Sequence, residues 1–189
     1  MPTPAMKTLV MMFPPTFGNS PHYSLDVIVL SFGRLGSGGM TTFGILFFDG
    51  TEELDAVGPW EVFTMASKQR DDISVVSISE HGGTVTCNKG MRIIMDHAIT
   101  DAPKLDVILV PGGSGTRTEV NNTALLSWIA EVSKDCKWVT SVCTGSMLLA
   151  EAGPAAGKRI TPHWAAVDMV RDRGKAGEVL DDVRYVRDG

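Results

Sequence analysis

The chain has 189 residues, of which 43% are hydrophobic and 21% charged, the ordinary composition of a single globular domain. Its formal net charge of -5, with no Lys/Arg-rich run, argues against a nucleic-acid-binding surface and favours a small uncharged ligand. Three cysteines, Cys87, Cys136 and Cys143, match neither a disulfide framework nor a zinc spacing. The sequence therefore predicts no metal site, and it indicates a reducing, cytoplasmic compartment.

Residues 1–40 are predicted to form an extension outside the folded domain. An apolar run at 9–13 is cut off by two prolines, so it is too short for a membrane span and is a poor signal peptide. Residues 14–40 are rich in Pro, Gly and Ser. The alternative, a targeting segment, is disfavoured because the stretch lacks the Arg-rich, amphipathic character of a transit peptide. We expect the folded domain to occupy residues 41–189, with Met40 as a candidate start.

From residue 41 onward, strand-like and helix-like patterns alternate. Short apolar runs or two-residue periodicity predict strands, and the longer segments between them are typical of helices. In chain order we predict strand 43–48, helix 52–67 with a break at Gly58-Pro59, strands 73–79, 84–87 and 105–110, helix 122–133, strand 137–142 and helix 146–152. This order predicts an α/β domain with a mostly parallel sheet covered by helices on both faces, whose ligands bind at the carboxyl ends of the strands.

The segment 138–150 predicts the chemical centre. An apolar strand runs into Cys143, a turn of small residues and a helix, so the cysteine stands above the sheet as the serine does in the G-x-S-x-G elbow of hydrolases. The free N–H groups and positive dipole end of that helix favour an anion, which predicts a lowered pKa for the thiol. The alternative is that Cys143 is a small buried hydrophobic residue.

A cysteine nucleophile needs a proton partner, and two residues are candidates. Asp55 follows the first predicted strand and could face the cysteine across the top of the sheet, although the local pattern favours an acidic residue that caps the helix. His163 is a further candidate base, but a histidine beside a tryptophan is more often a packed, hydrogen-bonded residue.

Two strand ends carry unusual loops, at 111–115 and 141–145. Consecutive glycines allow backbone N–H groups to approach a substrate closely, as an oxyanion hole requires, although a plain turn would have the same composition. The candidate substrate-binding or oxyanion residues are therefore Gly112, Gly113, Ser114 and Gly145.

Taken together, the motifs closely resemble the DJ-1/PfpI superfamily, whose domains are also described as class I glutamine amidotransferase-like. They are Leu-Asp-x-x-Gly-Pro at 54–59, Pro-Gly-Gly at 111–113, Ser-Val-Cys-Thr-Gly-Ser at 141–146 and Thr-x-His-Trp at 161–164. The resemblance covers roughly residues 42–189 and is strongest to isocyanide hydratases. Proteases of the superfamily carry His directly after the cysteine, so Thr144 argues against a peptidase.

The resemblance implies that Cys143 is the nucleophile, that Asp55 hydrogen-bonds or exchanges protons with it, and that Thr144 helps to position it. It also implies a flavodoxin-like fold, a homodimer, and no metal or organic cofactor. Because the family core normally continues into a Gly-rich segment and a closing helix, we expect this chain to be a C-terminally truncated version.

The first functional hypothesis is a lyase that hydrates isocyanides, small uncharged molecules, to N-substituted formamides. The second is a non-catalytic, ligand-sensing domain of a transcription regulator, which would require a helix-turn-helix part beyond this sequence. The third is a redox or carbonyl-stress protein using the same thiol. Members of that kind typically present a Glu near the cysteine, whereas the matched position here is Asp55.

Overall fold

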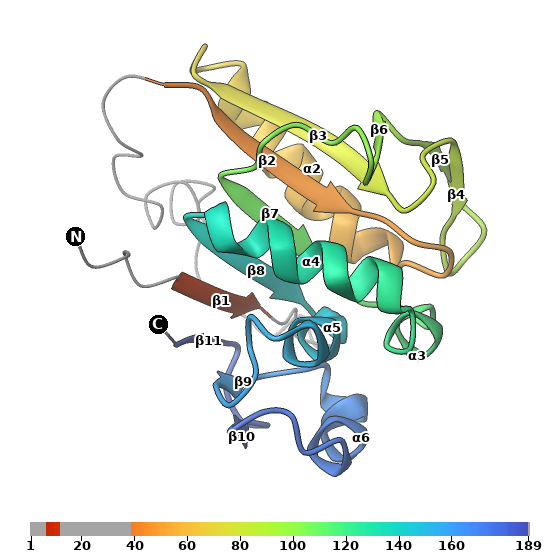
Figure 1. The fold of residues 1–189 in the computed structure, drawn as a ribbon, viewed down its shortest axis with the longest axis vertical. Helices are drawn as coiled ribbons and strands as arrows, with labels where there is room; N and C mark the ends of the chain where they lie inside the picture. The colour runs from red at the N-terminus through yellow and green to blue at the C-terminus, as the bar shows by residue number, and fades with distance from the viewer. Residues whose placement is uncertain (1–6, 12–38, 189) are drawn as a thin grey trace, which may run out of the picture.

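The computed structural model describes residues 7–11, by their backbone, and residues 39–188. Its centre is a seven-stranded sheet of order β11-β1-β8-β7-β2-β3-β6 (Figure 1). The strands are β1 Lys7–Met11, β2 Thr41–Leu46, β3 Ile73–Ser79, β6 His97–Ala98, β7 Val107–Val110, β8 Trp138–Val142 and β11 Tyr185–Asp188. Every neighbouring pair is parallel except β1 and β11. The predicted α/β class with a mostly parallel sheet is confirmed.

Helices cover both faces of this sheet. Helix α2 (Glu53–Ser67) lies on one face, and α4 (Thr123–Asp135) and α5 (Gly145–Ala152) lie on the other (Figure 1). The shorter elements are α3 Thr116–Glu119, α6 Val167–Asp172, a 3-10 turn at Trp164–Ala166, and two small two-stranded sheets, β4 Thr84–Thr86 with β5 Arg92–Ile94 and β9 Arg159–Ile160 with β10 Glu178–Val179.

The alternation of side chains along each strand produces two cores. On β7, Val107 and Leu109 belong to the core beneath α2, whereas Ile108 and Val110 belong to the core beneath α4 and α5. All four side chains are at most 1% exposed, which explains why the strand is apolar at every position.

Helix α2 runs without interruption through Gly58-Pro59, where the sequence suggested a break. Proline normally disfavours a helical conformation in the residue before it, because its ring meets that residue's Cβ. Gly58 has no Cβ, which removes this one clash within the helix.

The structure differs from the sequence expectation at the N-terminus. Residues 7–11 form strand β1, which lies inside the sheet, parallel to β8 from Lys7 opposite Trp138 to Met11 opposite Val142. The pairing is between segments far apart in the chain, so local composition did not indicate it, and it covers a backbone edge of β8. Residues 1–6 and 12–38 of the predicted extension lie outside the described residues. No helix within the described ranges is both long and apolar enough to cross a membrane.

Candidate active site

Cys143 lies in the sharp turn between β8 and α5. Its φ is 57°, and it is the only non-glycine residue in the described part of the chain with a positive φ. Such a conformation costs of order 1–3 kcal/mol and is found mainly where function requires it. Gly145 makes the turn sterically feasible, because a Cβ there would lie 2.1 Å from the carbonyl oxygen of Val110. Gly145 therefore serves the turn's packing against the end of β7.

Asp55 reaches this turn from the first turn of α2. Its side chain is buried, only 6% exposed, and its Oδ2 accepts a hydrogen bond of 3.2 Å from the backbone N–H of Gly112. The carboxyl group lies close enough to the Cys143 thiol that each group shifts the pKa of the other. The structure thus brings together the two residues that the sequence analysis paired as nucleophile and proton partner.

Gly112 separates and aligns this pair. A Cβ at Gly112 would lie 2.7 Å from the Cβ of Cys143 and 2.8 Å from Oδ2 of Asp55. Both distances are shorter than van der Waals contact, so any larger residue would push the thiol and the carboxylate away from their present positions. The requirement for glycine here is steric.

Thr144 anchors the cysteine turn to the loop that follows β7. The residue is 2% exposed, and its hydroxyl accepts hydrogen bonds from the Gly113 N–H and the Thr116 hydroxyl, both at 3.1 Å. The side chain of Arg117 donates to the Gly113 carbonyl at 2.9 Å from the other side. These contacts fit the positioning role that the resemblance implied for Thr144.

The N–H groups proposed for an oxyanion hole are already used within the protein. That of Gly112 donates to Asp55, and that of Gly113 donates to Thr144. In this structure both N–H groups therefore have partners within the protein. Their partners come from distant segments, which the sequence of the loop alone could not indicate.

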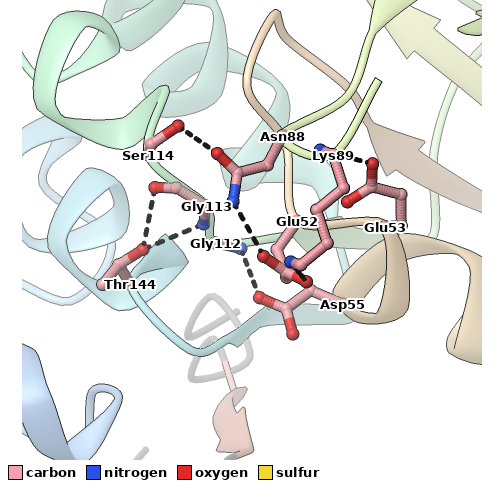
Figure 2. A network of polar contacts seen from close by, with 9 residues as sticks. All are labelled: Glu52, Glu53, Asp55, Asn88, Lys89, Gly112, Gly113, Ser114 and Thr144. Atoms are coloured by element: carbon pink, nitrogen blue, oxygen red, sulfur yellow. Dashed lines mark hydrogen bonds and ion pairs between the residues drawn. The ribbon is translucent and has the colours of Figure 1, made fainter. Parts of the chain in front are cut away.

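The hydroxyl of Ser114 is also occupied. It donates to Oδ1 of Asn88, which lies at the tip of the β4–β5 hairpin, and Nδ2 of Asn88 donates to Glu52 Oε2 at 3.1 Å (Figure 2). The neighbouring Lys89 forms an ion pair with Glu52 and donates its backbone N–H to Glu53 at 2.7 Å. Sequence reasoning missed Asn88 and Lys89, because a polar turn between two short strands carries no chemical signal of its own.

Burial sets the protonation of the pair. It raises the pKa of the Cys143 thiol to about 12, with the negative charge of Asp55 as the next cause, and these outweigh the backbone N–H of Thr144, which lowers it. The predicted lowering of the thiol pKa was therefore wrong: the helix-end effect is present but smaller. Burial also raises the pKa of Asp55 to about 6, although hydrogen bonds from Cys143 and Gly112 lower it. At neutral pH the sulfur holds the proton and Asp55 is a carboxylate.

His163 takes no part in this arrangement. Its Nδ1 accepts a hydrogen bond from the Ala165 N–H at 3.2 Å, and its ring lies 5.3 Å from that of Trp164. Within residues 39–188, no hydrogen bond joins it to Cys143 or Asp55, and its ring instead caps the 3-10 turn, whose Trp164 is 57% exposed. In the same range, no group of three or more His, Cys, Asp or Glu side chains could hold a metal ion.

Comparison with known proteins shows which family this chain is similar to. The model of the DJ-1/PfpI family matches residues 43–189. An isonitrile hydratase from Pseudomonas putida is 37% identical over 146 residues, which cover 77% of this chain and 61% of that protein. The HTH-type transcriptional regulator CdhR from Pseudomonas aeruginosa is 29% identical, with 69% of this chain and 39% of the regulator covered.

Solved structures agree on the fold. A ThiJ/PfpI family protein from Pseudomonas syringae superposes with a TM-score of 0.69 at 25% identity, over 90% of this chain and 66% of the other. The chain thus spans less than two thirds of the length of each of these three relatives. Since the family model covers most of the sequence and the fold is shared, the chain belongs to the DJ-1/PfpI family.

Proposed function

We propose that this protein hydrates isocyanides to N-substituted formamides, with Cys143 as the nucleophile and Asp55 as the group that carries the proton. The observation that carries the proposal is the close approach of the buried Asp55 carboxylate to Cys143 at a strained turn, with only Gly112 between them. The similarity to an isonitrile hydratase gives the contact its reaction class.

The first half of the reaction forms a bond between sulfur and carbon. As the sulfur of Cys143 attacks the terminal carbon of the isocyanide, Asp55 takes the thiol proton. The attack leaves an electron pair on that carbon, and Asp55 returns the proton to it. The product of this half is a thioimidate, in which the carbon carries one hydrogen, a double bond to nitrogen and a single bond to sulfur.

The second half consumes one water molecule. The water oxygen adds to the thioimidate carbon, and one of its protons goes to the nitrogen. The resulting tetrahedral adduct expels the sulfur of Cys143 as its carbon–oxygen double bond forms. The remaining proton returns to the thiol through Asp55. The sum is isocyanide plus water giving the formamide, with the enzyme unchanged.

The pKa values explain why the carboxylate is needed. A thiol whose pKa is raised to about 12 is almost entirely protonated at neutral pH, so it requires a neighbouring base when it attacks. Asp55, with a pKa of about 6, is ionised at pH 7 and close enough to take the proton. An uncharged substrate adds no further charge to this buried pair. We also propose that the protein acts in the cytoplasm as a homodimer and uses no cofactor.

The test is turnover by the full chain. Purified protein is mixed with an aryl isocyanide, and formamide formation is followed by absorbance for the parent, Cys143→Ala and Asp55→Asn. We expect turnover in the parent and its loss in both variants. Turnover by Cys143→Ala at the parent rate would refute the proposal.

A second candidate function is a ligand-sensing domain, and the similarity to CdhR is the observation that favours it. In that case the site around Cys143 would bind a small molecule without changing it. A folded parent protein that binds an isocyanide but releases it unaltered, together with an in-frame helix-turn-helix downstream in the gene, would support this alternative.

A further inference from the structure

We propose that Asn88 is a positioning residue of the candidate active site, whose carboxamide holds the start of α2 against the loop that follows β7. Asp55 projects from the former and Gly112 from the latter. The inference deepens the proposed function and rests on it for its effect on turnover.

The geometry of Asn88 is that of a two-sided clamp. Nδ2 donates to Glu52 Oε2 at 3.1 Å, and Oδ1 accepts from the Ser114 hydroxyl. The amide is thus used as donor toward one segment and as acceptor toward the other, which neither Asp nor Leu could reproduce at this position. Figure 2 shows Asn88 between Ser114 and Glu52, next to Gly112 and Gly113.

The backbone of the hairpin tip is fixed independently of the clamp. The N–H of Asn88 donates to the carbonyl of Thr51 at 2.7 Å, and the N–H of Lys89 donates to Glu53 at 2.7 Å. Because these bonds orient the hairpin tip, the Asn88 side chain loses little conformational entropy when its carboxamide binds Glu52 and Ser114. A preorganised clamp of this kind acts on side-chain placement more than on folding.

The segments that Asn88 joins already share backbone hydrogen bonds. The N–H of Glu52 donates to the Gly112 carbonyl at 2.9 Å, and the N–H of Gly115 donates to the Gly50 carbonyl at 3.1 Å. These bonds explain why losing the carboxamide should leave the fold intact. Loss of the carboxamide should instead change the positions of Asp55 and Gly112 relative to Cys143. A small displacement between two reacting groups lowers the rate strongly.

Several charged side chains lie near Cys143 and Asp55, and a change in any of them would also change the reactivity of the Cys143 thiol. Glu52 and Glu53 lie at the start of α2, Lys89 at the hairpin tip, and Arg117 on α3. Neutral replacements of Asn88 and Ser114 leave all of them in place. Any change in the ionisation of Cys143 then reports the position and burial of the pair.

The experiment measures alkylation of Cys143 by iodoacetamide in the full chain, from neutral to alkaline pH, by mass spectrometry of its peptide. We expect Asn88→Ala and Ser114→Ala each to be alkylated roughly three- to tenfold faster than the parent near pH 8, because a loosened pair is less buried and ionises more readily. The double variant should be no faster than the faster single one, because both changes remove the same clamp. Asn121→Ala is the matched control: that exposed residue makes no side-chain hydrogen bond within the described residues.

Turnover should move in the opposite direction. With an aryl isocyanide, Asn88→Ala should lose roughly five- to tenfold in kcat with little change in KM, since Asp55 would be less well placed to take the proton. Alkylation within twofold of the parent in both single variants, or effects that multiply in the double variant, would overturn the positioning role. If the parent itself shows no turnover, the proposed function fails, while the alkylation result still decides the role of Asn88. Ser114→Ala, which removes only a hydroxyl, covers the case in which Asn88→Ala does not fold.

Discussion

Strand β8 has a cysteine at each end. The two thiols have similarly raised pKa values, but they differ in their neighbouring groups and in their backbone setting. Burial raises the pKa of both Cys136, just before the strand, and Cys143, just after it, to about 12. Cys136 follows the C-terminus of α4, beside Asp106 and Asp135, and its thiol donates to the Leu105 carbonyl at 3.6 Å. Cys143 precedes the N-terminus of α5.

The difference lies in what can accept the proton. The partner of Cys136 is a backbone carbonyl, which cannot take a proton and hold it at neutral pH. The partner of Cys143 is a carboxylate whose own pKa is raised to about 6. A raised thiol pKa therefore does not separate a structural cysteine from a reactive one in this molecule. The adjacent base and the strained backbone do.

The largest expected effect tests that contrast directly. Cys143→Ala should lower isocyanide hydration by at least roughly 10³-fold, since the nucleophile is gone. Cys136→Ala should leave kcat and KM within about twofold, because no step of the proposed reaction uses that thiol. Equal losses in the two variants, measured as formamide formation by folded protein, would show that the comparison is false.

A smaller effect is expected from Gly112→Ala, which keeps both the thiol and the carboxylate but disturbs how they are placed relative to each other. The new Cβ would meet Cys143, Asp55 and the Thr144 N–H within 2.8 Å, so the carboxylate and thiol must separate. We expect a loss of roughly 10²-fold in kcat. Gly39→Ala, where an added Cβ has nothing within 4 Å, is the control. Parent-like turnover in Gly112→Ala would mean that the close approach of the pair is unimportant.

The raised pKa of Asp55 also predicts how stability depends on pH. Its carboxyl group, with a pKa of 3.8 when unperturbed and about 6 when folded, binds a proton more tightly in the native state. Its contribution to the free energy of unfolding is therefore fully present below about pH 4 and is lost as pH rises through 6. At one pKa unit per about 1.4 kcal/mol, the loss is about 3 kcal/mol.

The substitution Asp55→Asn removes the ionisable group, so the free energy of unfolding no longer falls between pH 4 and pH 7 on its account. We expect the variant to be more stable than the parent by up to about 3 kcal/mol at pH 7 and similar to it at pH 4, while hydration activity disappears. Urea unfolding at the two pH values measures the difference. A variant that is less stable than the parent at pH 7 would show that the carboxylate is a net stabilising group.

The central part of the fold could be predicted from sequence because its signals are local. The apolar run at 105–110 became β7, and the periodic segment at 122–133 became α4. Strand β1 was missed because its position depends on pairing with β8, which no local pattern encodes. In the β4–β5 hairpin, strand β4 was predicted, whereas β5, which pairs with it, was not.

For the site, sequence motifs nominated the residues but not their electrostatics. Cys143 and Asp55 were each visible at a strand end, and the resemblance paired them. The direction of the thiol pKa was predicted wrongly because the helix N-terminus is a local feature, whereas burial and the distance to Asp55 are tertiary. Asn88 could not be found at all, since its importance depends on Glu52 and Ser114 meeting at the hairpin tip.

The smallest expected effect concerns Cys136 and the stability of the fold. Its side chain is 6% exposed and packs in the core beneath α4, so Cys136→Ala should lower the free energy of unfolding by about 1 kcal/mol through the lost packing. Cys136→Val, which is somewhat larger than cysteine but fully apolar, should recover part of the loss, because burial there requires no thiol. Chemical denaturation of the three proteins measures this. Equal losses in the alanine and valine variants would mean that the hydrogen bond to Leu105, and not apolar packing, is what Cys136 contributes.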